Sequence, residues 1–95
     1  MNYTYILLCA DNTFYIGWTT DLDNRLEAHN DGKGAKYTRG RTPVKLVYWE
    51  EHKNRSEAQK REVALRRFNK KQKLNLIEGF QESLEKEQSI NYKIK

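Results

Sequence analysis

The sequence predicts a single small domain of the α+β class, and three observations lead to this prediction. Residues 3–17 hold two short runs rich in β-branched and aromatic side chains around Ala10-Asp11-Asn12, which is a β-hairpin pattern. Residues 43–50 form a third run of strand type, and helical patterns with capping residues lie before and after it. A chain of 95 residues is long enough for one modest core but not for two.

The length of the hairpin loop determines which side chains share a face of the sheet. A three-residue loop that ends in a left-handed residue suits Asn12, because Asn tolerates a positive φ better than any residue except Gly. In that register Leu7 lies opposite Tyr15, and Tyr5 lies opposite Gly17. A two-residue loop would shift the register and send the two tyrosines to opposite faces. We therefore expect both phenols on one face with open space at Gly17, which indicates either a site or two strand tyrosines at the edge of the core.

The segment after the hairpin predicts the first helix. Thr20 is the expected N-cap, acidic residues follow in the first turn, and Gly32 ends the helix. Four side chains recur at the spacing of one buried stripe, namely Leu22, Arg25, Leu26 and His29. The guanidinium and the imidazole on that stripe are either functional groups or, with equal weight, a rim arginine and a satisfied surface histidine.

Residues 31–42 predict an exposed, mobile loop that is rich in glycine. The residues of interest in it are Lys33, Lys36, Tyr37, Arg39 and Arg41. Basic side chains around an aromatic ring suit contact with a phosphate backbone and an unstacked base. We expect these five residues to bind nucleic acid, and the alternative is a solvated connector. The loop has no Walker or dinucleotide-binding pattern, so it does not predict a nucleotide cradle.

The third strand and the second helix complete the α+β pattern. Pro43 begins the strand at residues 43–50, a position that suits an edge strand. Asn54 or Ser56 caps the helix that follows. One face of this helix is apolar and carries Ala58, Leu65 and Phe68.

Glu62 lies in the middle of that apolar face. An unpaired carboxylate on a buried stripe costs free energy, so this side chain needs a partner. On spacing alone the slightly favoured partner is a cation, either Arg25 or Arg66. A metal ion is the other interpretation, and Glu62 is the best metal ligand among the acidic residues of the chain.

The last helix begins after Asn69, which forms a capping box with Gln72. Its apolar residues are expected to pack inward, and these are Leu74, Ile77 and Phe80. We place the domain at residues 1–82 and expect a frayed polar tail at 83–95. The only anchors expected in the tail are Ile90, Tyr92 and Ile94.

Composition and charge limit the classes of function. Lys and Arg total 18 against 13 Asp and Glu, and the formal net charge of +5 favours an anionic partner such as nucleic acid. No apolar run approaches the roughly 20 residues of a membrane helix, and the first residues do not resemble a signal peptide. The single cysteine, Cys9, cannot form an internal disulfide and is expected to be a small core residue. We therefore expect a cytoplasmic protein with no membrane partner.

Two short motifs resemble the pair that names the GIY-YIG nuclease superfamily. Tyr3-Thr4-Tyr5 is followed by Tyr15-Ile16-Gly17, and the second motif matches in full, while Tyr3 stands where the family usually has Gly. The family similarly has an arginine and, in many branches, a histidine on its first helix, and a glutamate on a later helix. The matching residues here are Arg25, His29 and Glu62.

The resemblance covers about residues 3 to 80. It is strongest to the short stand-alone bacterial branch, which is similar to the nuclease domain of eukaryotic structure-selective endonucleases. The fold that it implies is a small three-stranded antiparallel sheet flanked by helices.

The resemblance implies metal-assisted hydrolysis of phosphodiester bonds in DNA, with structure selectivity and a role in DNA repair. By this resemblance Glu62 holds one Mg²⁺ (or Mn²⁺) ion, which takes oxygen ligands and keeps most of its waters. Tyr5 accepts the proton of the attacking water, and His29 passes it on. Tyr15 orients the phosphate or the water, and Arg25 stabilises charge in the transition state. The partner expected is nucleic acid, with DNA favoured over RNA, and a protein partner could supply substrate specificity.

Two other classes of function remain open. A non-catalytic nucleic-acid-binding module with a degenerate nuclease site would use the basic loop without cleaving, and Tyr3 in place of the motif glycine favours it. A protein-interaction domain would present its basic face to an acidic partner. Neither class explains a glutamate on an apolar helix face as directly as a nuclease does. The family often carries a late asparagine near the site, for which Asn69 and Asn75 are both candidates.

Overall fold

The protein forms one small antiparallel sheet with helices on both faces. The computed structural model describes the backbone of residues 1–94 and the side chains of residues 1–86. Strand β1 (Asn2–Leu8) lies in the centre, between β2 (Phe14–Thr19) and β3 (Lys45–His52), and both pairings are antiparallel. The helices are α1 (Leu22–Asn30), α2 (Arg55–Arg66) and α3 (Lys70–Ile94). The expected α+β fold with a three-stranded antiparallel sheet is confirmed.

The hairpin turn has the three-residue loop that its sequence predicts. Asn12 has a φ of 65°, and its N–H donates to the Cys9 carbonyl oxygen at 3.0 Å. The Cys9 N–H donates to the Thr13 carbonyl oxygen at 2.8 Å, which closes the loop. Asp11 accepts hydrogen bonds from the backbone and the hydroxyl of Thr13. This turn fixes the register in which Tyr5 faces Gly17.

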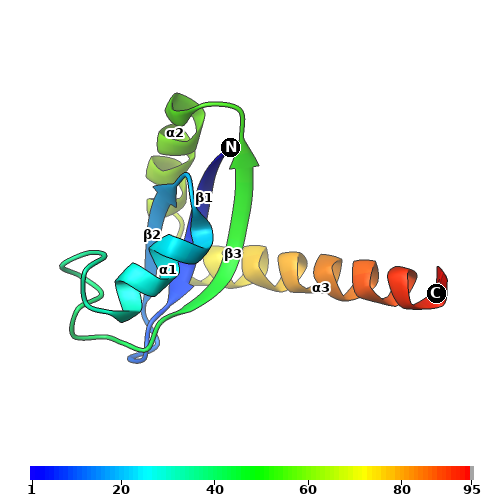
Figure 1. The fold of residues 1–95 in the computed structure, drawn as a ribbon, viewed down its shortest axis with the longest axis horizontal. Helices are drawn as coiled ribbons and strands as arrows, with labels where there is room; N and C mark the ends of the chain where they lie inside the picture. The colour runs from blue at the N-terminus through cyan, green and yellow to red at the C-terminus, as the bar shows by residue number, and fades with distance from the viewer. Residues whose placement is uncertain (95) are drawn as a thin grey trace.

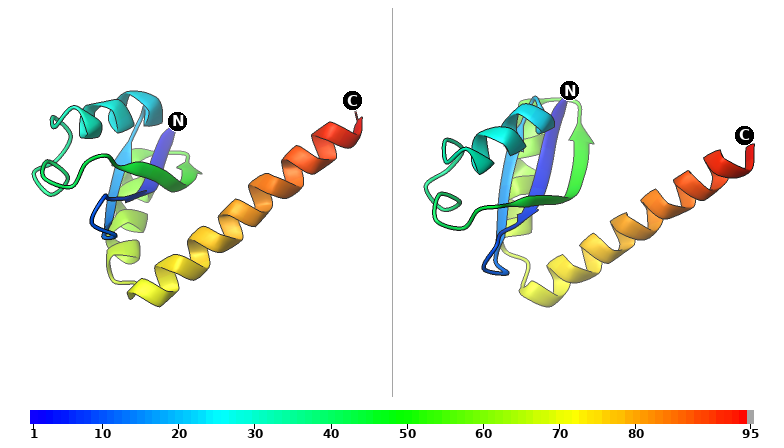
Figure 2. Two further views of the ribbon diagram at one scale, coloured as in Figure 1. Left: turned by 90° about the horizontal axis from the view of Figure 1, so that it is seen from below. Right: turned by 60° about the horizontal axis from the view of Figure 1, so that its bottom comes forward.

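The sheet separates two hydrophobic clusters, because α1 and α2 lie on opposite faces of it, as Figures 1 and 2 show. On the α2 side the buried residues are Ile6, Ile16, Tyr48, Leu65 and Ile77. On the α1 side they are Tyr5, Leu7, Cys9 and Val44, with Leu22 and Leu26 of α1 packed against them. Strand β1 is therefore buried on both faces.

A buried hydrogen bond joins β1 to α2. Thr4 is fully buried, and its hydroxyl donates to the Ala58 carbonyl oxygen at 2.8 Å. Of the two expected caps of α2, Asn54 is the N-cap, and its side chain accepts a hydrogen bond from the Glu57 N–H. Thr4 therefore fixes where the first turns of α2 lie along the central strand.

Two element boundaries differ from the sequence-based expectation. The N-cap of α1 is Asp21 and not Thr20, because the Asp21 carboxylate accepts from the Asn24 N–H at 3.1 Å. Its negative charge also interacts favourably with the positive end of the helix dipole. Strand β3 spans Lys45–His52 and not residues 43–50, so it starts and ends two residues later than expected. The Val44 backbone instead bonds to the side chain of Asn30, with its N–H donating to Oδ1 at 2.7 Å and its carbonyl oxygen accepting from Nδ2 at 3.2 Å.

Helix α3 leaves the body of the domain and extends away from the sheet (Figure 2). The expected capping box is present, because Asn69 and Gln72 each accept a hydrogen bond from the other's N–H. Ile77 is buried, but Leu74 is 40% exposed, so the expectation that Leu74 packs inward is wrong. The helix continues beyond residue 82 through Ile94. The three side chains expected to anchor the tail lie outside the described residues, and the division of the chain at residue 82 stays a prediction.

No helix in the described part of the chain combines the length and the apolar character that crossing a membrane requires.

Candidate functional site

The two tyrosines of the hairpin lie on one face of the sheet, with their ring centroids 6.4 Å apart. The space at Gly17 is not empty. A Cβ atom on Gly17 would lie 2.6 Å from the Tyr5 hydroxyl oxygen and 3.1 Å from a ring carbon of Tyr15. The missing side chain at Gly17 therefore makes room for the Tyr5 phenol itself. Tyr5 is only 2% exposed and lies deeper than Tyr15.

A directed chain of hydrogen bonds runs from Tyr5 through His29 to Thr38. The Tyr5 hydroxyl lies 2.9 Å from His29 Nε2, and His29 Nδ1 lies 2.9 Å from the Thr38 hydroxyl. Thr38 donates its only hydroxyl hydrogen to the Ala35 carbonyl oxygen at 3.1 Å. Thr38 must therefore accept from Nδ1–H, which leaves Nε2 without a hydrogen and makes it the acceptor for the Tyr5 hydroxyl. The imidazole is held in the tautomer that can take a proton from Tyr5.

Burial sets the protonation states of this pair. Burial raises the pKa of Tyr5 to about 12, and contact with Arg25 opposes that rise. Burial and, to a smaller extent, the Arg25 charge together lower the pKa of His29 to about 4. Both side chains are therefore neutral at neutral pH.

Arg25 is the cation beside both phenols. Its polar contact with the Tyr5 hydroxyl raises the pKa of Arg25, and Tyr15 acts in the same direction. One terminal nitrogen donates to the Gly34 carbonyl oxygen at 3.2 Å. The Nε atom is buried and has no hydrogen-bond partner among the described residues. An unsatisfied buried donor costs about 1–3 kcal/mol, so this guanidinium is not arranged for stability alone.

The glycine-rich loop at residues 31–42 lies over the α1 side of the site. Thr38 is fully buried, and Gly34 packs directly against the His29 ring, so part of the loop belongs to the interior. The side chains of Lys33, Lys36 and Arg39 are exposed, as expected. Their role in binding nucleic acid stays a prediction.

Tyr37 and Arg41 connect this loop to the hairpin. Tyr37 stacks on Tyr15 with ring centroids 6.0 Å apart and an interplanar angle of 28°. The Arg41 guanidinium carbon lies 4.0 Å from the Tyr37 ring centroid, and Arg41 Nε donates to the Asp11 carboxylate at 2.9 Å. Arg41 also donates to the Tyr37 carbonyl oxygen at 2.7 Å. Arg41 thus has internal partners and holds the Tyr37 ring in position.

Glu62 projects from α2 and is paired with Arg66. The Glu62 side chain is 16% exposed, that of Arg66 is 56% exposed, and the two groups are 3.2 Å apart. Of the two cations expected as partners, Arg66 forms the bond. The Glu62 charge also makes a small contribution to raising the pKa of Tyr5. In the part of the chain that the structure describes, no three His, Cys, Asp or Glu side chains gather as a metal-binding group.

This donor set suits one kind of metal ion. A single carboxylate cannot enclose an ion, but Mg²⁺ is commonly held by one or two carboxylates, its own waters and a substrate phosphate. Glu62 therefore fits a hydrated divalent ion that is completed by substrate. It does not fit a structural metal centre made of protein ligands alone.

An open cleft with a volume of about 310 Å³ lies next to these residues. It is lined by Phe14, Tyr15, Ile16, Tyr37, Arg66 and Lys73. Tyr15 belongs both to the cleft and to the tyrosine pair on the sheet. The cleft therefore borders the candidate site at Tyr15.

Sequence patterns did not predict the place in the site of four residues that the fold brings there. Thr38 and Gly34 contact His29 from a loop whose path no local periodicity predicts. Arg66 could be found from its position one turn after Glu62, but only as an ion-pair partner. Lys73 comes from the first turns of α3, and its place in the cleft depends on how the two helices meet.

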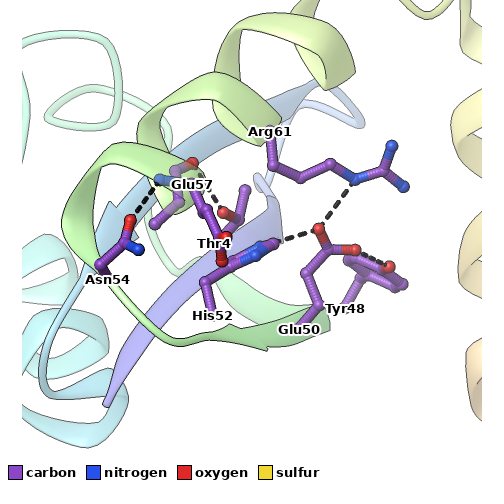
Figure 3. A network of polar contacts seen from close by, with 8 residues as sticks. Thr4, Tyr48, Glu50, His52, Asn54, Glu57 and Arg61 are labelled. Atoms are coloured by element: carbon purple, nitrogen blue, oxygen red, sulfur yellow. Dashed lines mark hydrogen bonds and ion pairs between the residues drawn. The ribbon is translucent and has the colours of Figure 1, made fainter.

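A second, partly buried polar network lies on the α2 side of the sheet, and Figure 3 shows it. The Tyr48 hydroxyl donates to Glu50, and this carboxylate also accepts from Arg61 Nε at 2.7 Å and from His52 Nε2 at 3.0 Å. Burial, with a smaller contribution from the hydrogen bond to Glu50, raises the pKa of Tyr48 to about 12. In this network Glu50 is the shared acceptor, and Tyr48, Arg61 and His52 each donate to it.

Comparisons with known proteins agree with this arrangement. Residues 1–75 match the GIY-YIG catalytic domain family. A UPF0213 protein of Clostridium perfringens is 57% identical over 77 residues, covering 81% of this chain and 83% of that protein. A UPF0213 protein of Staphylococcus haemolyticus is 49% identical over 77 residues, covering 81% and 94%.

Two solution structures are similar in fold. The UPF0213 protein of Bacillus halodurans has 43% sequence identity and a TM-score of 0.53, covering 82% of this chain and 84% of that one. A protein from E. faecalis has 44% identity and a TM-score of 0.56, covering 84% and 85%. The GIY-YIG domain is a nuclease domain, and this implies binding of nucleic acid. The match over residues 1–75, together with the paired tyrosines, shows that this chain belongs to the GIY-YIG catalytic domain family, among relatives that carry the UPF0213 name.

Proposed function

We propose that the protein is a metal-dependent endonuclease that hydrolyses phosphodiester bonds in DNA, with selectivity for branched or otherwise irregular structures. The observation that carries the proposal is the directed chain from Tyr5 to His29 to Thr38, beside the charge of Arg25. A structural tyrosine needs one partner for its hydroxyl. This tyrosine has an acceptor that is itself oriented by a third group, which is the geometry of an activated proton acceptor.

The order of proton transfers follows from the hydrogen bonds. The phenol oxygen of Tyr5 takes a proton from the attacking water while the Tyr5 hydroxyl proton passes to His29 Nε2. Tyr5 is not a phenolate before the reaction, because its pKa of about 12 keeps the hydroxyl protonated at neutral pH. Transfer through the phenol avoids a free phenolate, since one proton leaves as the other arrives.

Arg25 couples this transfer to the presence of substrate. Its positive charge helps to keep His29 neutral in the free protein. A phosphate beside Arg25 would neutralise part of that charge, which raises the pKa of His29 and makes it a better proton acceptor. The guanidinium then stabilises the charge that develops on the phosphate. Tyr15, at the wall of the cleft, orients the phosphate or the water.

Glu62 is the residue that would hold a divalent ion. When bound, Mg²⁺ or Mn²⁺ supplies charge neutralisation at the phosphate and at the leaving 3′ oxygen. The Arg66 side chain is more than half exposed, so it can turn into solvent when Glu62 takes another partner. The ion pair that competes with the metal is therefore weak.

The test is a cleavage assay on single-stranded, duplex, flap and junction DNA with Mg²⁺ or Mn²⁺, comparing the wild type with Glu62→Gln. We expect cleavage by the wild type and none by Glu62→Gln. The free energy of unfolding should change by less than about 1 kcal/mol, because the Glu62–Arg66 pair is at the surface on the arginine side. The matched control is Glu78→Gln on α3. Binding without cleavage by the wild type would support the non-catalytic module instead.

A further inference from the structure

The cleft beside the candidate site has two chemically different walls. Phe14, Tyr15 and Tyr37 give it aromatic side chains, and Arg66 and Lys73 give it positive charge. Its volume of about 310 Å³ lies at the lower end of the roughly 300–1,000 Å³ found for small-molecule sites. It has room for one group with the size of a nucleotide and not for a duplex.

The aromatic wall is held in place before any ligand arrives. Tyr37 stacks on Tyr15, and Arg41 covers the Tyr37 ring while bonded to Asp11. Tyr37 nevertheless remains 40% exposed. A fixed and partly exposed aromatic surface binds a planar group with little loss of side-chain entropy.

The charged wall belongs to a larger basic surface at the corner between α2 and α3. Residues 66–73 hold five cations and no acidic residue, and the cations are Arg66, Arg67, Lys70, Lys71 and Lys73. On the other side the loop contributes Tyr37 to the cleft, and its exposed cations Lys33, Lys36 and Arg39 lie within four residues of Tyr37 in the sequence. The cleft therefore combines aromatic rings with the cations Arg66 and Lys73, and surfaces that bind single strands use the same combination to hold the backbone and stack the bases.

We propose that this cleft binds one unpaired nucleotide next to the scissile phosphate, with its base against the aromatic wall and a flanking phosphate on Arg66 and Lys73. The inference rests on the proposed nuclease function and names its substrate class as nucleic acid with an unstacked nucleotide at the cleavage point. In a continuous duplex each base is paired and stacked, and extracting it costs a few kcal/mol. Single strands, flaps and junctions already provide such a nucleotide.

The experiment measures binding separately from cleavage, and uses the Glu62→Gln protein so that the substrate stays intact. The ligands are oligonucleotides with a single 2-aminopurine, either paired within a duplex or unpaired at a bulge, in DNA and RNA forms. Anisotropy gives the affinity, and 2-aminopurine fluorescence reports whether the base is unstacked or stacked on protein. We expect at least about tenfold tighter binding of the unpaired form, and quenching of the probe by the aromatic wall.

Two variants test the two walls, and one tests neither. Tyr37→Leu should weaken binding of the unpaired form at least about fivefold and remove the quenching. Lys73→Gln should weaken binding and lower the salt dependence by about one phosphate contact. Lys45→Gln, an exposed lysine on β3, is the charge-matched control. Melting temperatures of all three establish that each variant folds.

The outcomes separate this inference from the proposed function. Equal affinity for paired and unpaired forms, or unchanged binding by both Tyr37→Leu and Lys73→Gln, overturns the inference even if the wild type cleaves DNA. A preference for the unpaired form that both variants remove supports it even if the wild type cleaves nothing, in which case the nuclease proposal fails alone. A preference limited to DNA or to RNA identifies the strand that the cleft accepts.

Discussion

Tyr5 and Tyr48 are two buried tyrosines on opposite faces of one sheet, and burial raises the pKa of each to about 12. Their surroundings differ. Tyr48 donates to Glu50, a carboxylate that Arg61 and His52 also contact. Tyr5 donates to a neutral imidazole and lies beside Arg25, whose buried Nε has no partner among the described residues.

The comparison shows that a perturbed pKa alone does not identify a site. Both hydroxyls have the same shift, and burial is the main cause of each. What distinguishes Tyr5 is a neighbouring group that can accept its proton and a neighbouring cation whose hydrogen-bonding capacity is not used up. Around Tyr48 the charges compensate one another, which is what a structural network requires.

The largest expected effect separates the two tyrosines by activity. Tyr5→Phe removes the proposed proton acceptor and should lower the cleavage rate by about 10²- to 10⁴-fold, the usual contribution of general acid–base catalysis. Tyr48→Phe should leave the rate within about threefold, although it costs about 1–3 kcal/mol of stability by leaving Glu50 with one bond fewer. Single-turnover rates and denaturant unfolding of both variants measure the two effects. Equal loss of cleavage in both variants would mean that the two networks do not differ in function.

The second prediction concerns the pH dependence of stability. The pKa of His29 falls from 6.5 to about 4 on folding, so between these values the unfolded chain binds a proton that the folded chain does not. The stability that neutral His29 contributes is fully present above pH 6.5. The free energy of unfolding should fall by about 3 kcal/mol on this account as the pH is lowered to 4. Chemical unfolding at pH 7, 5 and 4 should show a shallower decline for His29→Asn than for the wild type. A decline that His29→Asn leaves unchanged contradicts the prediction.

A third prediction tests the close contact on the Tyr5 side. Gly17→Ala places a methyl group against the Tyr5 phenol and should destabilise the fold by about 1–3 kcal/mol through overpacking. It should also displace Tyr5 from His29 and lower any cleavage rate. Gly40→Ala is the matched control, because nothing lies within 4 Å of the added atom there. Thermal unfolding compares them, and similar melting temperatures would show that the Tyr5 ring can move aside freely.

The smallest expected effect on stability comes from the exposed loop on the Tyr5 side. Lys36→Glu and Arg39→Glu should each change the free energy of unfolding by no more than about 0.5 kcal/mol, because both side chains are exposed. Both should weaken nucleic-acid binding, and more so at low salt. Lys45→Glu on β3 should have a smaller effect on affinity. Anisotropy titrations across a salt series decide this, and equal effects of all three changes would assign the attraction to net charge alone.

The sequence was sufficient for the local half of the site. Asn12 determines the loop length and so the faces of Tyr5 and Tyr15, and the four-residue spacing puts Arg25 and His29 on one side of α1. These are short-range rules of turns and helices, so one sequence contains them.

The remaining contacts depend on tertiary packing. Thr38 reaches His29 from an irregular loop, and Lys73 reaches the cleft through the angle between α2 and α3. On the other face Glu50 and His52 share a side of β3, but Arg61 meets them only because α2 crosses that face. The periodicity of the sequence does not predict such tertiary contacts.

The hydrogen bond from Thr4 to Ala58 has a consequence for how the two halves of the site stay aligned. Thr4 and Tyr5 are consecutive, so they point to opposite faces of β1, and each is bonded to a helix on its own side. Ala58 is one helical turn before Glu62, and His29 lies one turn after Arg25. The helix that carries Glu62 and the imidazole of His29 are thus hydrogen-bonded to neighbouring residues of the same strand. A displacement of β1 along its own axis would therefore move both of these hydrogen-bonded contacts together.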